Sequence, residues 1–408
     1  MSALDRFVIV GASLAGAKAA EALREQGFEG QIVLIGAEAH RPYARPELSK
    51  GYLAGSTELA KVYVHGPEWY AEHDVELRLG VRATAIDRTE RRVRLDDGSD
   101  LGYDKLLLVT GSRPRHLDAP GADAAGVYYL RTVEDSQALS RLFTEIKQLV
   151  VIGAGWIGLE VTAAARNAGL AVTVIESAEL PLIRVLGPEV AQVFADLHRE
   201  HGVDLRLGAH LTEILVRDGR AAGVRLQDGT EIAGDAVLVA IGAMPNTELA
   251  RDADLEVDDG IVVNAALRTS DPDIFAAGDV ANAEHPLLRR HIRVEHWANA
   301  LKQPATAAAA MLGHEASYHD LPYFYTDQYD LGMEYVGFVE PDGYDSVVFR
   351  GDVAAREFIA FWIANSRVVA GMNVNVWDVV DTIKSIIARG EQIDPARLAD
   401  PSRSLDDI

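Results

Sequence analysis

Residues 149–176 read LVVIGAGWIGLEVTAAARNAGLAVTVIE. An apolar run is followed by the glycines Gly153, Gly155 and Gly158, by a helical pattern that ends at Gly169, and by a second apolar run. This order predicts a strand, a tight turn, a helix and a second, parallel strand. In such a unit the first glycine permits the turn, the second lets the backbone approach a pyrophosphate, and the third lets helix and strand pack closely. The stretch therefore predicts a dinucleotide-binding βαβ unit.

The second predicted strand of this unit ends on Glu176, 23 residues after Gly153. An acid at about this distance binds the ribose hydroxyls of a dinucleotide. Because a carboxylate repels a 2′-phosphate, the sequence favours NADH over NADPH. Arg184 follows Glu176 by 8 residues, and we expect it either over the adenine or at a solvated surface position.

A similar unit lies near the N-terminus. Residues 7–16 read FVIVGASLAG, with Ser13 where the middle glycine is expected, and a helical pattern and the strand-like QIVLIG (31–36) follow. KLLLVTGSRP (105–114) and AVLVAIGAMP (236–245) are also alike, since each is an apolar strand that runs into a glycine and then a proline. These repeats predict two related nucleotide-binding domains, one inserted into the other.

The resulting prediction is an α/β protein with two Rossmann-like domains and a C-terminal α+β domain. From Tyr323 onward aromatic and β-branched runs predict a sheet, and WDVVDTIKSIIARG (377–390) predicts a helix. We place the first nucleotide domain at residues 1–113 and 247–322. The inserted nucleotide domain covers 114–246, and the C-terminal domain covers 323–408.

Composition excludes several classes of function. The chain of 408 residues has a formal charge of −23, which argues against nucleic acid and anionic membranes as partners. It contains no cysteine, which excludes a thiol nucleophile, a disulfide or a cysteine-bound metal, and we predict no metal site. No apolar run reaches the roughly 18 residues of a membrane span, and the N-terminus lacks signal-peptide features, so we expect a cytoplasmic protein.

Four segments together resemble a known family. RPYARPELSKGYL (41–53), GAGWIGLEVTAAARNAG (153–169), IFAAGDVA (274–281) and YTDQYDLGMEYVG (325–337) stand in this order. They resemble the FAD-dependent pyridine nucleotide-disulfide oxidoreductase superfamily. The likeness is to the ferredoxin and rubredoxin reductases of bacterial oxygenase and P450 systems, of which the apoptosis-inducing factors are relatives. The resemblance covers nearly the whole chain and implies that one glycine loop holds FAD and the other takes NADH.

The resemblance also implies which residues bind these two molecules. For FAD they are Gly11, Ser13, Leu14, Ala15, Gly16, Glu38, Arg45, Lys50, Ala83, Thr110, Gly111, Arg131, Asp279, Val280 and Trp297. For NAD they are Gly153, Gly155, Trp156, Ile157, Gly158, Glu160, Glu176, Arg184, Ile241 and Gly242. A helix starting at Val280 is expected to direct its dipole at the flavin, and Trp297 to pack beside the isoalloxazine. Where the family commonly has an acid for the FAD ribose this chain has Ala37, and Glu38 is the candidate replacement.

Lys50 and Glu160 are the residues that the resemblance places near flavin N5 and the nicotinamide. There an ion pair can steady the carboxamide of the nicotinamide. The alternative at this point is a solvated bridge on a helix surface, which contributes little.

The implied activity is that of an NADH:ferredoxin oxidoreductase, in which a hydride passes from NADH to FAD and electrons leave one at a time to a ferredoxin. The basic stretch HPLLRRHIR (285–293) suggests docking of the ferredoxin at Arg289, Arg290 and Arg293. An NADH-sensing flavoprotein and a membrane-associated NADH–quinone reductase remain alternatives. The apolar stripe of residues 377–390 is better explained by packing in the C-terminal domain than by a membrane. The oligomeric state is a monomer or a homodimer.

Overall fold

The computed structural model describes residues 5–341 and 343–408. The chain divides into two compact units, each built from separate segments. The first unit comprises Met1–Pro46, Glu58–Arg113 and Ala243–Asp320. The second unit comprises Glu47–Thr57, Pro114–Gly242 and Leu321–Ile408. The short segment 47–57 therefore belongs with the second unit, although both of its flanks belong to the first.

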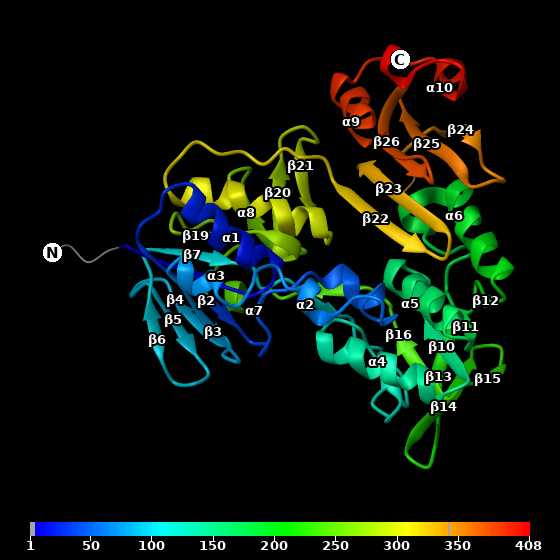
Figure 1. Cartoon of the computed structure of the whole chain (residues 1–408), viewed down its shortest axis with the longest axis horizontal. Helices are drawn as coiled ribbons and strands as arrows, with labels where there is room; N and C mark the ends of the chain where they lie inside the picture. The colour runs from blue at the N-terminus through cyan, green and yellow to red at the C-terminus, as the bar shows by residue number, and fades with distance from the viewer. Residues whose placement is uncertain (1–4, 342) are drawn as a thin grey trace. The chain divides into compact units, whose positions relative to one another are not determined.

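The first unit is built on a parallel sheet with the strand order β19-β7-β1-β2-β3 (Figure 1). Its strands are β1 (Arg6–Val10), β2 (Gln31–Gly36), β3 (Val75–Leu79), β7 (Lys105–Leu108) and β19 (Ile274–Ala276). The central strands are almost continuously apolar and buried, as expected for a parallel sheet covered on both faces. Helix α1 (Leu14–Glu25) packs beside α8 (Trp297–Met311), and short helices α2 (Leu59–Val62), α3 (Trp69–Glu72) and α7 (Glu248–Asp252) complete this unit.

Two small antiparallel or mixed sheets flank the parallel sheet of the first unit. One is β4-β5-β6, made of β4 (Ala83–Asp87), β5 (Arg92–Leu95) and β6 (Asp100–Gly102). The other is β18-β20-β21, made of β18 (Ile261–Val263), β20 (Ala281–His285) and β21 (Arg290–Arg293). A further pair is β8 (Ser112–Pro114) with β17 (Ala243–Pro245).

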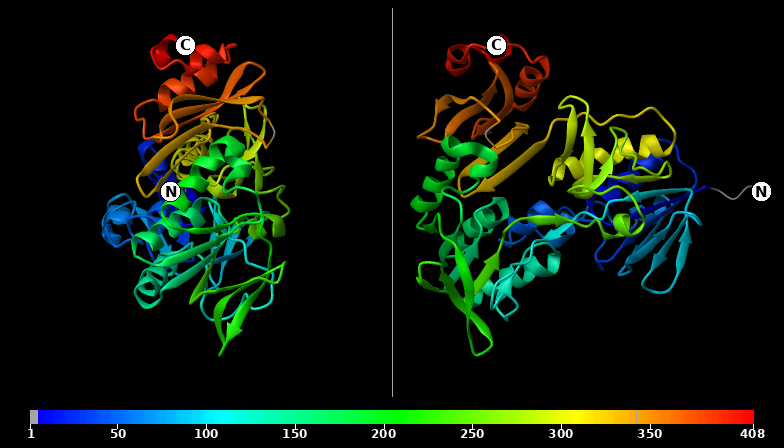
Figure 2. Two further views of the ribbon diagram at one scale, coloured as in Figure 1. Left: turned by 90° about the vertical axis from the view of Figure 1, so that its right-hand side faces the viewer. Right: turned by 180° about the vertical axis from the view of Figure 1, so that it is seen from behind.

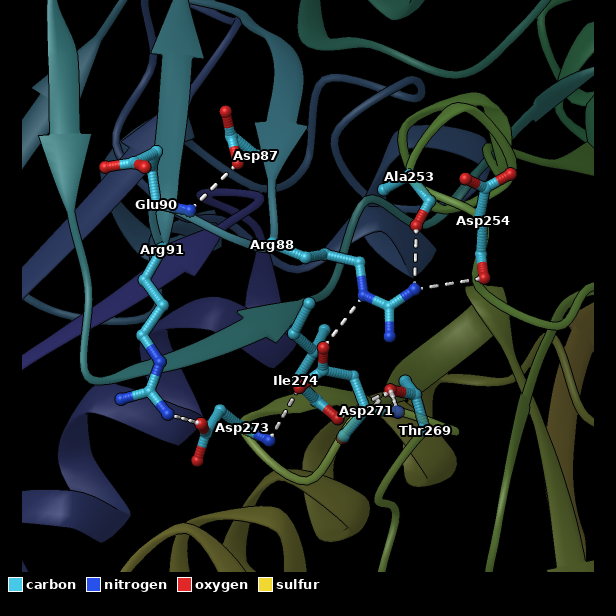
Figure 3. A network of polar contacts seen from close by, with 10 residues as sticks. All are labelled: Asp87, Arg88, Glu90, Arg91, Ala253, Asp254, Thr269, Asp271, Asp273 and Ile274. Carbon is cyan, nitrogen blue, oxygen red and sulfur yellow. Dashed lines mark hydrogen bonds and ion pairs between the residues drawn. The ribbon is translucent and has the colours of Figure 1, made fainter.

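An ionic network anchors the turn between β4 and β5 (Figure 3). Arg88 donates to Asp271 at 2.8 Å and to the carbonyl oxygens of Ala253 and Asp254, both at 3.3 Å. Arg91 reaches Asp273, which also pairs with Lys105 of β7. Because Asp271 and Asp273 precede β19, the network ties the small β4-β5-β6 sheet to the edge of the parallel sheet.

The second unit repeats the plan of the first, with the strand order β12-β11-β10-β16-β9. The strands are β9 (Val127–Tyr128), β10 (Gln148–Ile152), β11 (Ala171–Ile175), β12 (Asp204–Arg206) and β16 (Ala236–Val239). The helices are α4 (Val133–Glu145), α5 (Trp156–Asn167) and α6 (Ile183–Glu200). A small antiparallel sheet is formed by β13 (Leu211–Arg217), β14 (Arg220–Leu226) and β15 (Glu231–Ala233). In both units the strand before the glycine turn is central in a parallel sheet, which confirms the predicted Rossmann-like fold.

The C-terminal part of the second unit is an antiparallel sheet with the order β22-β23-β26-β25-β24, whose strands are labelled in Figure 1. Figure 2 shows these yellow and orange strands from two further sides. The strands of this sheet are β22 (Tyr323–Gln328), β23 (Leu331–Gly337), β24 (Ser346–Asp352), β25 (Glu357–Ala364) and β26 (Arg367–Val374). Helices α9 (Val380–Arg389) and α10 (Pro395–Ala399) cover it. Ile383 and Ile386 of α9 are buried against this sheet, so the apolar stripe predicted for the helix is part of a core.

His198 lies on α6 with its side chain fully buried. Its Nε2 atom is 2.8 Å from Oε1 of Gln328 at the end of β22, so it joins the helix to the C-terminal sheet. Burial lowers the pKa of His198 from 6.5 to about 4, although the bond to Gln328 favours the charged form. The ring is therefore neutral near neutral pH.

This histidine makes the fold sensitive to acid. Between its folded and unfolded pKa values the unfolded chain binds the extra proton, so stability falls as pH drops through this window. When the pH falls from about 7 to about 5, the free energy of unfolding of the wild type should drop by about 2 kcal/mol more than that of His198→Gln. Urea unfolding at both pH values measures this difference. His314→Gln, at an exposed position, is the matched control, and equal acid losses in His198→Gln and wild type contradict the assignment.

Candidate functional sites for two dinucleotides

The glycine turn of the second unit leaves room above the N-terminus of α5. Gly153 has a φ of +99°, and a Cβ atom there would lie 2.3 Å from the carbonyl oxygen of Ala240. Gly155 precedes the first turn of α5, and a Cβ built on it would meet nothing within 4 Å. Among the described residues no side chain caps this end of the helix, so its backbone N–H groups face that space. The open space at Gly155 and the available backbone N–H groups of α5 fit the binding of a pyrophosphate.

Glu176 lies directly beside this turn. Its Oε2 atom accepts a hydrogen bond from the backbone N–H of Ala154 at 2.8 Å, and Oε1 accepts from that of Ala178 at 2.9 Å. The carboxylate is thus fixed at the end of β11, where the sequence predicts a contact with the ribose. Arg184 is exposed on the first turn of α6, and Ile241 and Gly242 follow β16 after Ala240. The predicted NAD contacts therefore gather at the carboxyl ends of the strands of one sheet, and their roles remain a prediction.

The turn of the first unit is built in the same way, with serine in the middle position. Gly11 has a φ of +126°, and a Cβ there would lie 2.1 Å from the carbonyl oxygen of Val109. Ser13 precedes α1 with an extended backbone, and its hydroxyl does not cap the helix. Leu14, Ala15 and Gly16 form the first turn of α1. The small side chain at residue 13 therefore leaves the helix end accessible, as a second pyrophosphate requires.

Glu38 and Arg45 form one polar cluster after β2. Arg45 lies 2.5 Å from Oε1 of Glu38 and donates to the hydroxyl of Tyr43 at 2.7 Å. Tyr43 in turn donates to Oε2 of Glu38 at 2.5 Å. Burial opposes the charge of Arg45, yet Tyr43 and Glu38 together hold the pKa of its guanidinium above the ordinary value. Glu38 is thus already bound by two donors, and its proposed replacement of an acid at Ala37 remains a prediction.

Asp279 lies in a single 3₁₀ turn, Gly278–Val280, and accepts a hydrogen bond from Ser112 at 3.2 Å. The expected helix starting at Val280 is wrong. The chain continues as strand β20, because residues 281–285 pair with β18 on one side and β21 on the other. The helix that packs against this turn is α8, which begins at Trp297.

His296 immediately precedes α8, and burial lowers the pKa of its ring to about 4, although Asp279 favours the charged form. The ring is therefore neutral near neutral pH. Trp297 itself is 36% exposed, which leaves part of the indole surface accessible.

The remaining predicted FAD residues divide between the two units. Ala83 is buried at the start of β4, and Thr110 and Gly111 follow β7. Asn246, which the sequence analysis missed, binds Thr110 twice: its side-chain amide donates to the carbonyl oxygen of Thr110 at 2.8 Å, and its backbone carbonyl accepts from the Thr110 hydroxyl at 2.7 Å. Arg131 lies in the second unit, where its backbone N–H donates to Asp135 at the start of α4.

The carboxylate of Glu160 is the centre of a buried polar cluster within the second unit. Lys50 Nζ lies 2.6 Å from Glu160 Oε1, and the two side chains are only 14% and 6% exposed. Two hydroxyl groups also donate to this carboxylate, Ser49 at 2.5 Å and Thr326 at 2.6 Å. The pair is therefore not a solvated surface bridge. Ser49 and Thr326 were missed because nothing in the sequence connects either of them to Glu160.

Further acidic and aromatic groups surround this cluster. Lys50 Nζ lies 5.5 Å from the centre of the Tyr325 ring, and burial, together with the nearby acids, raises the pKa of Tyr325 to about 12. Burial also raises the pKa of Asp327, and Glu160 and Glu47 add to this while Lys50 opposes it. Lys50 thus lies among several acidic side chains.

The proposed docking arginines differ in exposure. Arg289 and Arg290 are exposed at the hairpin between β20 and β21. The side chain of Arg293 is only 12% exposed, and it pairs with Asp259 at 3.2 Å and with Glu295. Two acids therefore compensate the charge of Arg293, which leaves Arg289 and Arg290 as the exposed cations of this stretch, and docking at these residues stays a prediction.

Within residues 5–341 and 343–408, no helix is both long and apolar enough to cross a bilayer. The same described residues contain no group of three or more His, Asp or Glu side chains arranged to hold a metal ion.

Comparisons with known proteins identify the family. A family model described as pyridine nucleotide-disulphide oxidoreductase matches residues 5–304, and one described as reductase C-terminal matches residues 323–408. The ferredoxin–NAD(+) reductase component of the anthranilate 1,2-dioxygenase system of Burkholderia cepacia is 43% identical, with 98% of each chain covered. Putidaredoxin reductase of Pseudomonas putida is 41% identical, with 100% of this chain and 97% of the relative covered.

Solved structures agree with these matches. The covalent putidaredoxin reductase–putidaredoxin complex matches with a TM-score of 0.94 at 39% identity, covering 99% of this chain and 97% of the other. The ferredoxin reductase for the CYP199A2 system of Rhodopseudomonas palustris matches with a TM-score of 0.95 at 37% identity, covering 99% of both chains. The resemblance inferred from the sequence is confirmed: this chain belongs to the pyridine nucleotide-disulphide oxidoreductase family.

Proposed function

We propose that the protein is an NADH-dependent ferredoxin reductase that delivers electrons to an oxygenase or cytochrome P450 system. The main observation behind this proposal is that two glycine turns, each followed by a helix without a side-chain cap in the described residues, occur in a chain without cysteine. Two turns suit two dinucleotides, and the missing cysteine excludes a dithiol or thiol as the next electron carrier. Electrons therefore leave the bound flavin directly for an external acceptor. The names of the relatives support an iron–sulfur protein as that acceptor.

The residues of the two units fit two different tasks. The first unit would hold FAD, with Gly11 and the first turn of α1 at the pyrophosphate and Asp279 at the ribitol. The second unit would bind NADH, with Glu176 at the adenosine ribose and Lys50 and Glu160 at the carboxamide of the nicotinamide. When bound, FAD supplies the change from two-electron chemistry with NADH to one-electron transfer. The contribution of the protein is to orient and hold the two cofactors.

The direct test is anaerobic mixing of the purified flavoprotein with NADH or NADPH, followed by addition of an oxidised [2Fe–2S] ferredoxin. We expect fast bleaching of the flavin band by NADH, a much slower response to NADPH because of Glu176, and rapid recovery only when ferredoxin is present. Slow bleaching by NADH with formation of a long-lived complex would favour the sensing role instead. Absence of a flavin band after purification and reconstitution contradicts both roles.

The docking surface can be tested by charge reversal at the two exposed arginines. We expect Arg289→Glu combined with Arg290→Glu to lower kcat/KM for an acidic ferredoxin about tenfold, because charges at the rim of an interface mainly set the association rate. The loss should shrink at high salt. Reduction of the small acceptor ferricyanide serves as the internal control and should not change. If kcat/KM for ferredoxin remains at the wild-type value, the hairpin is not the docking site.

The quinone reductase alternative rested on the apolar stripe of residues 377–390. Ile383 and Ile386 of this stripe pack in the core of the C-terminal sheet, so the stripe no longer supports that alternative. We further propose that the protein works in the cytoplasm, because NADH is a coenzyme of the cell interior.

A further inference from the structure

A chain of buried polar side chains leads away from Glu160 through the C-terminal sheet to α6. Thr326 donates to Glu160 at 2.6 Å, and Gln328 donates from Nε2 to the hydroxyl of Thr326 at 3.3 Å. On its other side Gln328 presents Oε1 to Nε2 of His198 at 2.8 Å. The side chains of Thr326, Gln328 and His198 are at most 1% exposed. All of these residues lie within the second unit.

The donors and acceptors of this chain can be arranged in only one direction. An amide oxygen only accepts, so Nε2 of His198 must carry a proton to bind Gln328. Nδ1 is then the acceptor, and the hydroxyl of Tyr329 lies 3.4 Å from it. Burial lowers the pKa of His198 to about 4, so the ring holds this single proton near neutral pH. The direction is set at the other end of the chain: the Glu160 carboxylate only accepts, so Thr326 donates to it, and the Thr326 oxygen accepts from the N–H₂ group of Gln328, which leaves Oε1 for His198.

We propose that Thr326 and Gln328 are positioning residues for the Glu160 carboxylate, and that His198, as the donor to Gln328, holds the amide in the orientation through which they act. This inference rests on the proposed function, in which Glu160 and Lys50 bind the nicotinamide end of NADH. It assigns to the C-terminal sheet a part in NADH reduction that is distinct from docking a partner.

The physical basis is the number of donors on the carboxylate. Oε2 of Glu160 is held by Ser49, whereas Oε1 is shared by Lys50 and Thr326. Loss of the Thr326 hydroxyl leaves Lys50 as the one remaining contact among those described here for Oε1, which allows the carboxylate plane to rotate. A carboxylate that loses a hydrogen-bond donor also takes up a proton at higher pH.

Other titratable groups also face this position. Glu47 and Lys50 come from segment 47–57, and Tyr325 and Asp327 come from β22. Because several groups can titrate here, the pH dependence of the bleaching rate must be compared between wild type and variants, and the profile of one protein is not assigned to a single residue.

The first experiment compares Thr326→Val with Thr326→Ser in the flavin-loaded protein. We expect Thr326→Val to slow flavin bleaching by NADH about tenfold and to move the acid limb of the rate profile up by about one pH unit. The affinity for NAD⁺, measured by calorimetry at several pH values, should fall with the same pH dependence. Thr326→Ser keeps the hydroxyl and should restore both profiles. Thr173→Val, at another buried threonine of the second unit, is the control for loss of a buried hydroxyl as such.

The second experiment separates positioning from general structural damage by a double-mutant cycle with Glu160→Gln. If Thr326 acts through Glu160, Thr326→Val should change the rate and the NAD⁺ affinity far less in the Glu160→Gln background than in wild type. Equal fold-losses in the two backgrounds would overturn the inference. A Glu160→Gln variant with the wild-type rate and NAD⁺ affinity would instead refute the proposed function of Glu160, and with it the need for positioning.

Gln328→Leu tests the outer part of the chain. It removes both hydrogen bonds of the amide but leaves the Thr326 hydroxyl in place. We expect a loss of about threefold in the bleaching rate, smaller than that of Thr326→Val, because Thr326 can still donate to Glu160 without being oriented. A wild-type rate and pH profile in Gln328→Leu would restrict the positioning role to Thr326 and overturn the part assigned to Gln328 and His198.

Discussion

Lys50→Met should slow reduction of the bound flavin by NADH about 100-fold, because the substitution removes the cation opposite a buried carboxylate. Glu160 would keep the hydroxyl groups of Ser49 and Thr326 but lose the charge that lies 2.6 Å away. An uncompensated buried charge costs about 3–5 kcal/mol, so the carboxylate should become protonated or the cluster should rearrange. Rapid mixing with NADH measures the rate, and urea unfolding measures the accompanying loss of stability.

The matched control for this substitution is Lys61→Met, at an exposed lysine of α2. It makes the same change in side chain and net charge at a residue that takes no part in the described Glu160 cluster, and we expect wild-type rates and stability. A Lys50→Met protein that is bleached by NADH at the wild-type rate would show that the ion pair only stabilises the fold.

The other large effect is expected at the glycine turn of the second unit. Gly153 and Gly155 differ in backbone φ and in the space around them, so replacing each by alanine should have a different consequence. Gly153→Ala places a methyl group 2.3 Å from a carbonyl oxygen at a φ of +99°. We expect a loss of about 3 kcal/mol in the free energy of unfolding, and NADH binding should be lost with it. Gly155, by contrast, has an ordinary φ of −80°, and a Cβ atom added there by Gly155→Ala would meet nothing within 4 Å. Its stability should not change, but the affinity for NADH should fall about tenfold or more, since the methyl group occupies the approach to the helix end.

Urea unfolding and calorimetric titration with NAD⁺ distinguish these two results. Gly169→Ala is a useful third variant, since Gly169 has a φ of +87° but open space around it. It should therefore show the cost of backbone strain alone, about 1 kcal/mol. Wild-type NAD⁺ affinity in Gly155→Ala would mean that the pyrophosphate does not approach this turn.

The sequence is informative where local pattern and global fold depend on the same residues. The two strand–turn–helix units, the α+β character after Tyr323 and the position of Glu176 at the end of a strand are all recognised within windows of about 30 residues. Their glycines and apolar runs are required by local geometry, so the fold follows from them. The ion pair of Lys50 with Glu160 was expected from the family resemblance alone, since the two residues are far apart in the sequence.

The errors have the opposite origin. Whether the chain after Val280 becomes a helix or a strand depends on two partner strands, β18 and β21, that its own sequence does not specify. The side chain of Arg293 is little exposed because it pairs with Asp259, which is distant in sequence, and with Glu295, and the stretch HPLLRRHIR alone does not show this. The hydroxyl groups on Glu160 were missed for the same reason, because Ser49 and Thr326 are 111 and 166 residues away from it.

Segment 47–57 has a consequence for exchanging parts between related reductases. A chimera that takes residues 114–242 and 321–408 from one parent would take segment 47–57, with Ser49 and Lys50, from the other parent. Glu160 would then meet a lysine and a serine selected beside a different carboxylate. Because this loop is inserted between two segments of the first unit, neither limited proteolysis nor simple truncation should release the second unit intact. Coenzyme preference and hydride transfer in such hybrids should therefore be inherited together only when these eleven residues are transferred as well.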